Sequence, residues 1–278
     1  MSILFAALLG LIQGITEFLP ISSSGHLSVM QNLFNIQGMQ EVDTFFDVLL
    51  HLATLISICL VYRFEIKDMI KEAGGFISDI RHPKPDEGDP KPARRLVIMI
   101  IIATLPLILI LPFNDLIDKL SNNTYFIGVA FLITGSILYL SDRLKRGRKT
   151  EKNMTVVDAV KIGVCQAVAT LPGISRSGST ITAGMAVGLN RNFAVKFSFL
   201  MSLPAVLGAV IIKFIDATKE GIDVSLLPAY LVGMLVAGVT GYFAINLVRI
   251  LSQKGKLGNF CYYCFAIGLL TIVLTIIL

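Results

Sequence analysis

The sequence predicts an all-α integral membrane protein with an inverted-topology repeat, made of six transmembrane helices and two re-entrant helical hairpins. Three observations support this fold class. The 278 residues are 54% hydrophobic and only 15% charged, with a mean hydropathy of +0.76, well above that of a soluble domain. Six apolar runs have the length of a membrane span. Two further apolar stretches are interrupted by polar motifs that resemble each other.

The six runs each come near the roughly 20 residues that a helix needs to cross a bilayer. In chain order they are Phe45 to Tyr62, Leu96 to Phe113, Thr124 to Leu140, Phe193 to Ile212, Leu226 to Val248 and Phe260 to Leu278. The other two stretches, Ser2 to Pro20 and Val156 to Leu189, contain or end in Gly, Pro, Ser and charged residues. We therefore expect them to be broken segments that do not span.

The basic residues collect in alternate loops. Arg63 to Arg95 holds eight Lys and Arg, Arg143 to Lys152 six and Arg249 to Lys256 three, whereas Asn114 to Asn123 holds one and Lys213 to Asp223 two against three acids. Positive loops stay in the cytoplasm, which predicts a multi-pass plasma-membrane protein whose last span ends outside. The net charge of +5 belongs to these loops and indicates no nucleic-acid partner.

The segment 63–95 is predicted to be a cytoplasmic linker. Its part from Asp79 to Arg95 is rich in proline and charge, so we expect it to be flexible.

The two halves of the chain resemble each other, with a one-residue adjustment at the proline. Gly10, Gln13, Leu19, Pro20, Ile21, Ser22, Ser24 and Gly25 recur as Gly163, Gln166, Leu171, Pro172, Ile174, Ser175, Ser177 and Gly178. The chain thus divides into 1–152 and 153–278, each a broken segment followed by three spans, in opposite orientations. In such repeats the site forms near the midplane where broken helices meet. We expect LPISSSGH and LPGISRSGST to be hairpin tips that line one cavity, since irregular backbone at membrane depth must be buried or wet.

Ionisable groups at membrane depth are costly, which makes each a functional candidate. Arg176 lies among Ser and Gly residues whose free backbone N–H groups favour anion binding, and a guanidinium grips phosphate with two parallel hydrogen bonds. The alternative is a structural salt bridge from Arg176 to Glu17 or Asp47.

Gln13 and Glu17 share a helical face, and their oxygens suit a hard divalent cation, Mg²⁺ or Ca²⁺, with Glu17 as metal ligand. Glu17 as a general base or as the partner of Arg176 stays open.

Ser22, Ser23 and Ser24 satisfy a turn or supply a nucleophile, and His26 lies close enough in sequence to activate Ser23. Asp47 and His51 also share a helical face; we expect them to support the site from behind rather than act in catalysis. The chain has no GxxxxGK[ST] motif, which excludes a nucleotide P-loop.

Two motifs, QGITEFLPISSSGHL at Gln13 to Leu27 and LPGISRSGSTIT at Leu171 to Thr182, resemble those of the undecaprenyl-diphosphate phosphatase family, also called BacA. The resemblance runs through the whole chain. It implies hydrolysis of undecaprenyl diphosphate to undecaprenyl phosphate and inorganic phosphate with a divalent cation, which recycles the lipid carrier for cell-wall synthesis and is expected to confer bacitracin resistance. It also implies a site that opens to the outer face of a bacterial plasma membrane.

The resemblance assigns roles position by position. Glu17, Ser23, His26 and Arg176 are the implied catalytic residues, and Gln13 stands where some members have a second glutamate, which puts a two-carboxylate metal site in doubt. The predicted substrate-binding residues are Gln13, Ser22, Ser24, Gly25, Ser175, Ser177, Gly178 and Thr180. The rival interpretation is a transporter or flippase of a polyprenyl phosphate; a homodimer is left open, and a purely structural protein is disfavoured by the buried ionisable groups.

Overall fold

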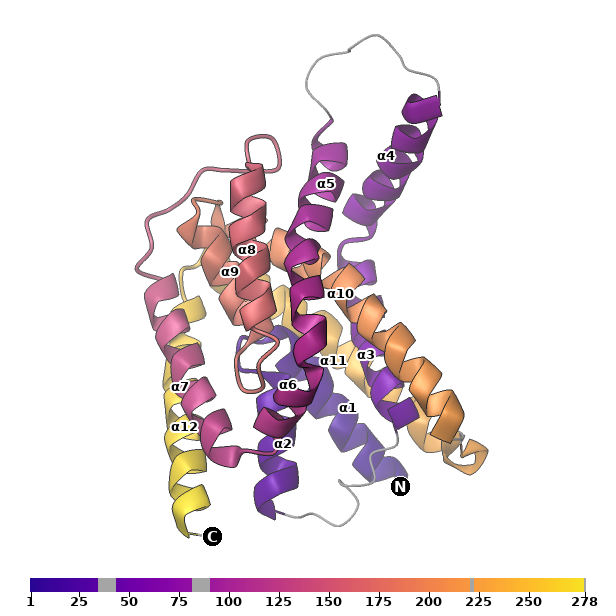
Figure 1. Ribbon diagram of the computed structural model, residues 1–278, viewed down its shortest axis with the longest axis vertical. Helices are drawn as coiled ribbons and strands as arrows, with labels where there is room; N and C mark the ends of the chain where they lie inside the picture. The colour runs from indigo at the N-terminus through magenta and orange to yellow at the C-terminus, as the bar shows by residue number, and fades with distance from the viewer. Residues whose placement is uncertain (35–43, 82–90, 221–222, 278) are drawn as a thin grey trace.

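The structure is a computed structural model that describes residues 1–34, 44–81, 91–220 and 223–277. The described residues form helices joined by turns (Figure 1). The helices are α1 (Ile3–Phe18), α2 (Ser23–Phe34), α3 (Thr44–Val61), α4 (Arg63–Arg81), α5 (Pro92–Thr104), η1 (Leu105–Phe113), α6 (Asn114–Ser121), α7 (Thr124–Ser141), α8 (Val156–Val168), α9 (Arg176–Ala186), α10 (Arg191–Glu220), η2 (Val224–Leu226), α11 (Leu227–Gln253), η3 (Leu257–Asn259) and α12 (Phe260–Ile277).

Five segments of the described chain are long and apolar enough to cross a membrane, and α3 with α4 makes a sixth if this bent pair is taken as one span. The five are Pro92–Phe113, Thr124–Ser141, Arg191–Lys219, Val224–Gln253 and Leu257–Ile277. The all-α, multi-pass fold class is confirmed, with each predicted span lying on one of these segments or on α3.

The segment 63–95, predicted as a cytoplasmic linker, is helical in its first part. Residues Arg63–Arg81 form α4, which turns by 88° from α3. The prediction missed this helix because Arg63–Arg81 is amphipathic rather than apolar, with Ile66, Met69 and Ile70 at helical spacing among charged residues. Helix α5 then begins at Pro92, and residues 82–90 of the predicted flexible segment lie outside the described residues.

The span after the linker changes its helix type midway. It begins as α-helix and continues from Leu105 as the 3-10 segment η1. Proline has no N–H to donate and clashes with the preceding turn, so Pro106 and Pro112 account for the change.

Both broken segments fold as helix, turn and helix. In Figure 1, α1 and α2 enter from the end of the molecule where the two termini lie, and α8 and α9 enter from the opposite end. The turns rest on left-handed residues, Ser22 with φ of 67° in the first and Gly173 with φ of 87° in the second. A serine in this region is uncommon and strained, so the surrounding packing must hold it.

The two halves exchange partners. Helix α1 packs on α11 and α8 packs on α5, while α3 lies against α10 and α7 against α12. Two glycines at equivalent repeat positions allow close approaches, because a Cβ would lie 2.2 Å from the Gly233 oxygen at Gly10 and 2.3 Å from the Ala103 oxygen at Gly163. These pairings agree with two interlocked halves, and the inverted repeat itself stays a prediction.

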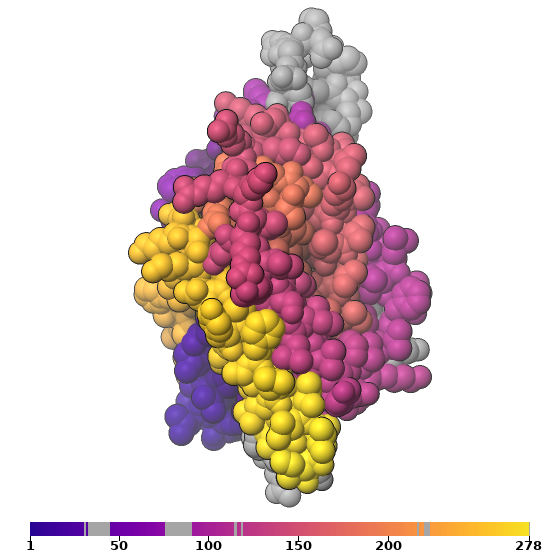
Figure 2. Space-filling model, turned by 90° about the vertical axis from the view of Figure 1, so that its left-hand side faces the viewer, coloured from indigo at the N-terminus to yellow at the C-terminus, as the bar shows by residue number. Residues whose placement is uncertain are grey.

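The core lies between these pairs, and the outside is apolar. Figure 2 shows α12, in yellow, on the outside of the molecule beside α7. Tyr262 and Ile276 of α12 are 70% and 73% exposed, which suits a lipid-facing surface but not an aqueous one. The chain is thus an integral membrane protein.

Candidate active site

The tips of the two hairpins enclose a cavity of about 180 Å³. It is lined by Thr16, Glu17, Ser22, Ser23, Ser24, His51, Ala169, Thr170, Ile174, Ser175 and Arg176. The expected shared cavity between LPISSSGH and LPGISRSGST is present. Nine of these eleven residues have polar side chains, although the cavity lies among apolar helices.

Each hairpin presents a helix N-terminus, capped by the same residue type, at this cavity. Ser175 Oγ accepts a hydrogen bond of 3.1 Å from the Gly178 N–H at the start of α9, and Ser22 Oγ accepts one of 3.3 Å from the Gly25 N–H at the start of α2. In each cap the serine two residues after the capping serine, Ser24 or Ser177, lies with its hydroxyl 3.3 Å from the capping hydroxyl. Two helix starts with their positive dipole ends at one cavity favour an anionic ligand.

Glu17 joins the two hairpins. Its Oε1 pairs with Nη2 of Arg176, and its Oε2 accepts hydrogen bonds from Gln13 Nε2 at 3.2 Å and Ser23 Oγ at 3.1 Å. The Glu17 side chain is 6% exposed, whereas that of Arg176 is 30% exposed. The guanidinium therefore neutralises a buried carboxylate on one side and still reaches open space on the other.

The expected pair of Ser23 and His26 is not made. Ser23 donates its hydroxyl proton to Glu17, and the ring nitrogens of His26 lie 2.7 Å from the Ser22 carbonyl oxygen and 2.7 Å from the Tyr263 hydroxyl. His26 also stacks on the Tyr263 ring, at 5.6 Å between centroids, and does not line the cavity. Ser23 and His26 are three residues apart in α2, but Glu17 accepts the Ser23 hydroxyl, while the Ser22 carbonyl and the Tyr263 hydroxyl hold the His26 ring.

His51 lies closer to the chemistry than we predicted. It lines the cavity, and its Nδ1 is 2.9 Å from the Asp47 carbonyl oxygen and 3.4 Å from the Asp47 carboxylate. Asp47 in turn pairs with Lys213 of α10. Asp47 does not line the cavity and its supporting role stays a prediction, whereas His51 lines the cavity directly. Their spacing of four residues predicts that Asp47 and His51 share a helical face, but it does not predict which of them lines the cavity.

The remaining predicted substrate-binding residues surround the cavity from behind. Ser177 and Glu17 both border a second, very small cavity, and Thr180 Oγ1 lies 2.6 Å from the Ser198 hydroxyl on α10. Gly25 and Gly178 act through their backbone N–H groups at the two caps.

The residues present do not fit a metal held by protein groups alone. In the described ranges no three His, Cys, Asp or Glu side chains lie together in a way that could hold an ion. Both oxygens of Glu17 already have partners, one of them a guanidinium that repels a cation. The predicted cation at Glu17 would need phosphate oxygens of the substrate to complete its shell, which is how Mg²⁺ is commonly bound.

Comparison with known proteins covers almost the whole chain. The sequence model of the family described as "Bacitracin resistance protein BacA" matches residues 6–270. The chain belongs to this family. Among similar proteins, undecaprenyl-diphosphatase of Carboxydothermus hydrogenoformans is 41% identical over 273 residues, which cover 97% of this chain and 96% of that one. Undecaprenyl-diphosphatase of Methanosphaera stadtmanae is 39% identical over 285 residues, which cover 100% of both chains.

Proposed function

We propose that this chain is an integral membrane phosphatase that hydrolyses undecaprenyl diphosphate to undecaprenyl phosphate and inorganic phosphate. One observation carries the proposal: Glu17 of the first hairpin holds both Arg176 of the second and the Ser23 hydroxyl, at the point where two helix N-termini meet. Similar chains named undecaprenyl-diphosphatase, over their full length, support this substrate.

The cavity suits the terminal phosphoryl group of such a lipid. Arg176 offers two N–H donors in one plane, and the first N–H groups of α2 and α9 have no partner within their own helices. Together they stabilise the charge that develops on the phosphoryl oxygens in the transition state.

Ser23 is the proposed nucleophile, and Glu17 is its base. The Ser23 Oγ attacks the terminal phosphorus, its proton passes to Glu17 Oε2 at 3.1 Å, and the bond to the bridging oxygen breaks as undecaprenyl phosphate leaves. Glu17 passes this proton to the oxygen of the leaving undecaprenyl phosphate. The ionised Glu17 then takes a proton from the water that attacks the phosphoserine and returns it to Ser23 Oγ as inorganic phosphate leaves. Once a phosphate shares Arg176, the Glu17 carboxylate becomes more basic than it is in the ion pair. A water molecule held by the same two residues would give the same products in one step.

The surroundings of the reaction are part of the proposal. We infer a bacterial plasma membrane, in which the end with both termini faces outward, because the basic loops lie toward the opposite end, where α4 ends and α5 begins (Figure 1). We propose that the active site opens to that outer face. A divalent cation, Mg²⁺ or Ca²⁺, bound jointly by Glu17 and the diphosphate, stays a prediction, as does a homodimer. Bacitracin resistance is expected because the family bears that name.

The test is phosphate release by the purified protein in detergent, where no gradient exists. Undecaprenyl diphosphate should be hydrolysed, and Ser23→Ala should lower turnover at least about 10²-fold, while Ser136→Ala, a change at an exposed serine of α7 outside the cavity, should leave turnover unchanged. Trapping of a phosphorylated Ser23 would distinguish attack by serine from attack by water. No phosphate release, together with movement of lipid phosphate between the leaflets of a liposome, would instead indicate a transporter.

A further inference from the structure

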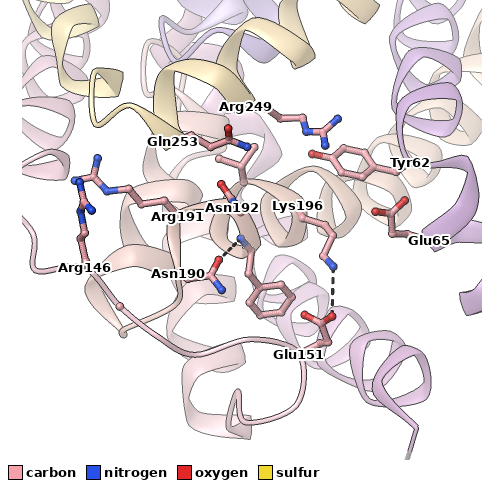
Figure 3. A pocket seen from close by; sticks show the side chains of 13 residues that line it. Tyr62, Glu65, Arg146, Glu151, Asn190, Arg191, Asn192, Lys196, Arg249 and Gln253 are labelled. Atoms are coloured by element: carbon pink, nitrogen blue, oxygen red, sulfur yellow. Dashed lines mark hydrogen bonds and ion pairs between the residues drawn. The ribbon is translucent and has the colours of Figure 1, made fainter.

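A second polar cavity lies among residues of the basic loops, and Figure 3 shows its lining side chains. Its volume is about 620 Å³, more than three times that of the candidate active site, and the two cavities share no lining residue. Its wall comes from the junction of α3 and α4, the loop between α7 and α8, the start of α10 and the end of α11. The proposed phosphatase reaction uses none of these residues.

The lining of this basic pocket is positively charged. Its charged members are the cations Arg146, Arg191, Lys196 and Arg249 and the acids Glu65 and Glu151. The cations exceed the acids by two. One acid is already engaged, because Lys196 Nζ lies 3.5 Å from Glu151 Oε1. In the described part of the chain Arg146 has neither an ion pair nor a hydrogen bond, and it is exposed at the pocket wall.

A buried hydroxyl faces the same space. Tyr62 is only 2% exposed, and its hydroxyl has no hydrogen-bond partner among the described residues. Figure 3 shows this hydroxyl pointing from the junction of α3 and α4 toward the pocket, below Arg249, whose guanidinium carbon lies 5.5 Å from the Tyr62 ring centroid. A buried hydrogen-bond donor without a partner is costly, so a ligand of this pocket would gain a hydrogen bond from this hydroxyl.

The start of the longest helix adds a third feature. Helix α10 begins at Arg191 beside this pocket, and Asn190 caps it by accepting a 2.7 Å hydrogen bond from the Phe193 N–H. The positive end of a 30-residue helix therefore adds to the guanidinium groups.

Lys196 pairs with Glu151, and Arg191 lies 3.8 Å from the Asp142 carboxylate, so among the described residues Arg146 and Arg249 are the lining cations without an ion pair. An anion in the pocket would be held by charge-assisted hydrogen bonds.

We propose that this basic pocket is a second, non-catalytic binding site for a phosphate group, borne by free inorganic phosphate or by an anionic lipid. Arg249 contacts the phosphate oxygens and the Tyr62 hydroxyl donates to one of them, while Arg146, on the opposite wall of the pocket (Figure 3), attracts the anion by its charge. Residues from both halves of the chain form the pocket, so an occupied site would hold the two halves together at this end. The proposal does not depend on the reaction at the other cavity.

The experiment uses a single fluorescent reporter. The chain has no tryptophan, so Gln253→Trp places a unique probe in the pocket wall. The full-length protein, in phosphatidylcholine nanodiscs, is titrated with inorganic phosphate, and with potassium chloride at the same ionic strength to correct for screening. A second set of nanodiscs contains phosphatidic acid. A saturable change of tryptophan emission with phosphate assigns free phosphate as the ligand. A change of emission only in the nanodiscs that contain phosphatidic acid assigns the lipid headgroup.

Variants that remove charge from the pocket test whether the change of emission reports binding there. The double change Arg146→Gln with Arg249→Gln should weaken binding at least about tenfold, since hydrogen bonds to charged groups are lost, while Arg148→Gln, an exposed cation of the same loop outside the pocket, should leave it unchanged. Tyr62→Phe should weaken binding severalfold without lowering the melting temperature. No emission change with either ligand, or equal affinity in the double variant and Arg148→Gln, would overturn the proposal.

Discussion

Replacing Arg176 by lysine tests the centre of the proposed mechanism. Lysine keeps the positive charge beside Glu17 but has no planar fork, so it cannot hold a phosphoryl group with two parallel N–H donors. We expect Arg176→Lys to fold and to be almost inactive. Arg176→Ala should be inactive and also less stable, because the Glu17 carboxylate would lose its charged partner.

The magnitudes follow from the environment of the pair. Loss of a donor that stabilises transition-state charge costs about 2.7–4 kcal/mol, or roughly 10²–10³ in rate. Breaking a fully buried ion pair costs about 3–5 kcal/mol of stability. Arg176 is 30% exposed and Glu17 keeps its hydrogen bonds from Gln13 and Ser23, so the loss in Arg176→Ala should be nearer the ~1.5–3 kcal/mol of one charged hydrogen bond.

Phosphate release and thermal unfolding in detergent, measured side by side, separate these effects. Arg143→Lys is the matched control, since that guanidinium lies 3.6 Å over the Tyr139 ring and outside the cavity. The double change Glu17→Gln with Arg176→Ala should recover stability without recovering turnover. Near-normal turnover of Arg176→Lys would refute phosphate gripping and leave the guanidinium only its structural salt bridge.

Three further predictions concern topology, metal and pH. A cysteine at Lys219 should react with an impermeant reagent from outside intact cells and one at Lys145 should not; the opposite labelling would reverse the orientation. Chelator should abolish phosphate release if a cation bridges Glu17 and the diphosphate, and full activity in chelator would remove the cation. Burial raises the pKa of Asp158, but hydrogen bonds from Lys149 and Thr155 outweigh it and leave that pKa below its usual value. The resulting stabilisation is present above the unfolded pKa near 3.8 and is lost as the pH falls through the lower folded value. Asp158→Asn should therefore lower the free energy of unfolding at pH 7 by about 1 kcal/mol, the usual value of a helix cap, and the difference from wild type should vanish in strong acid. A difference that is constant with pH would contradict this.

Much of the fold could be read from local patterns. The apolar runs place the spans because a helix must satisfy its own backbone in lipid, and this depends only on about 20 successive residues. The serines of the two motifs could likewise be expected at turns, since a capping serine binds an N–H three residues along. Helix α4 escaped prediction because its apolar residues form a stripe rather than a run.

The sequence by itself determined the all-helical membrane class, the two broken segments, the family, and Glu17 and Arg176 as candidates, because each depends on residues within one helix or one motif. Only the tertiary structure decided which side chains meet. Glu17 and Arg176 are 159 positions apart, and His26 contacts Tyr263 over 237 positions. Such contacts depend on where helices cross and which faces they present, and the close approaches at Gly10 and Gly163 set those crossings. Local periodicity does not predict these crossings. Ser23 could therefore be predicted as a nucleophile from its motif, but its hydrogen bond to Glu17 could not.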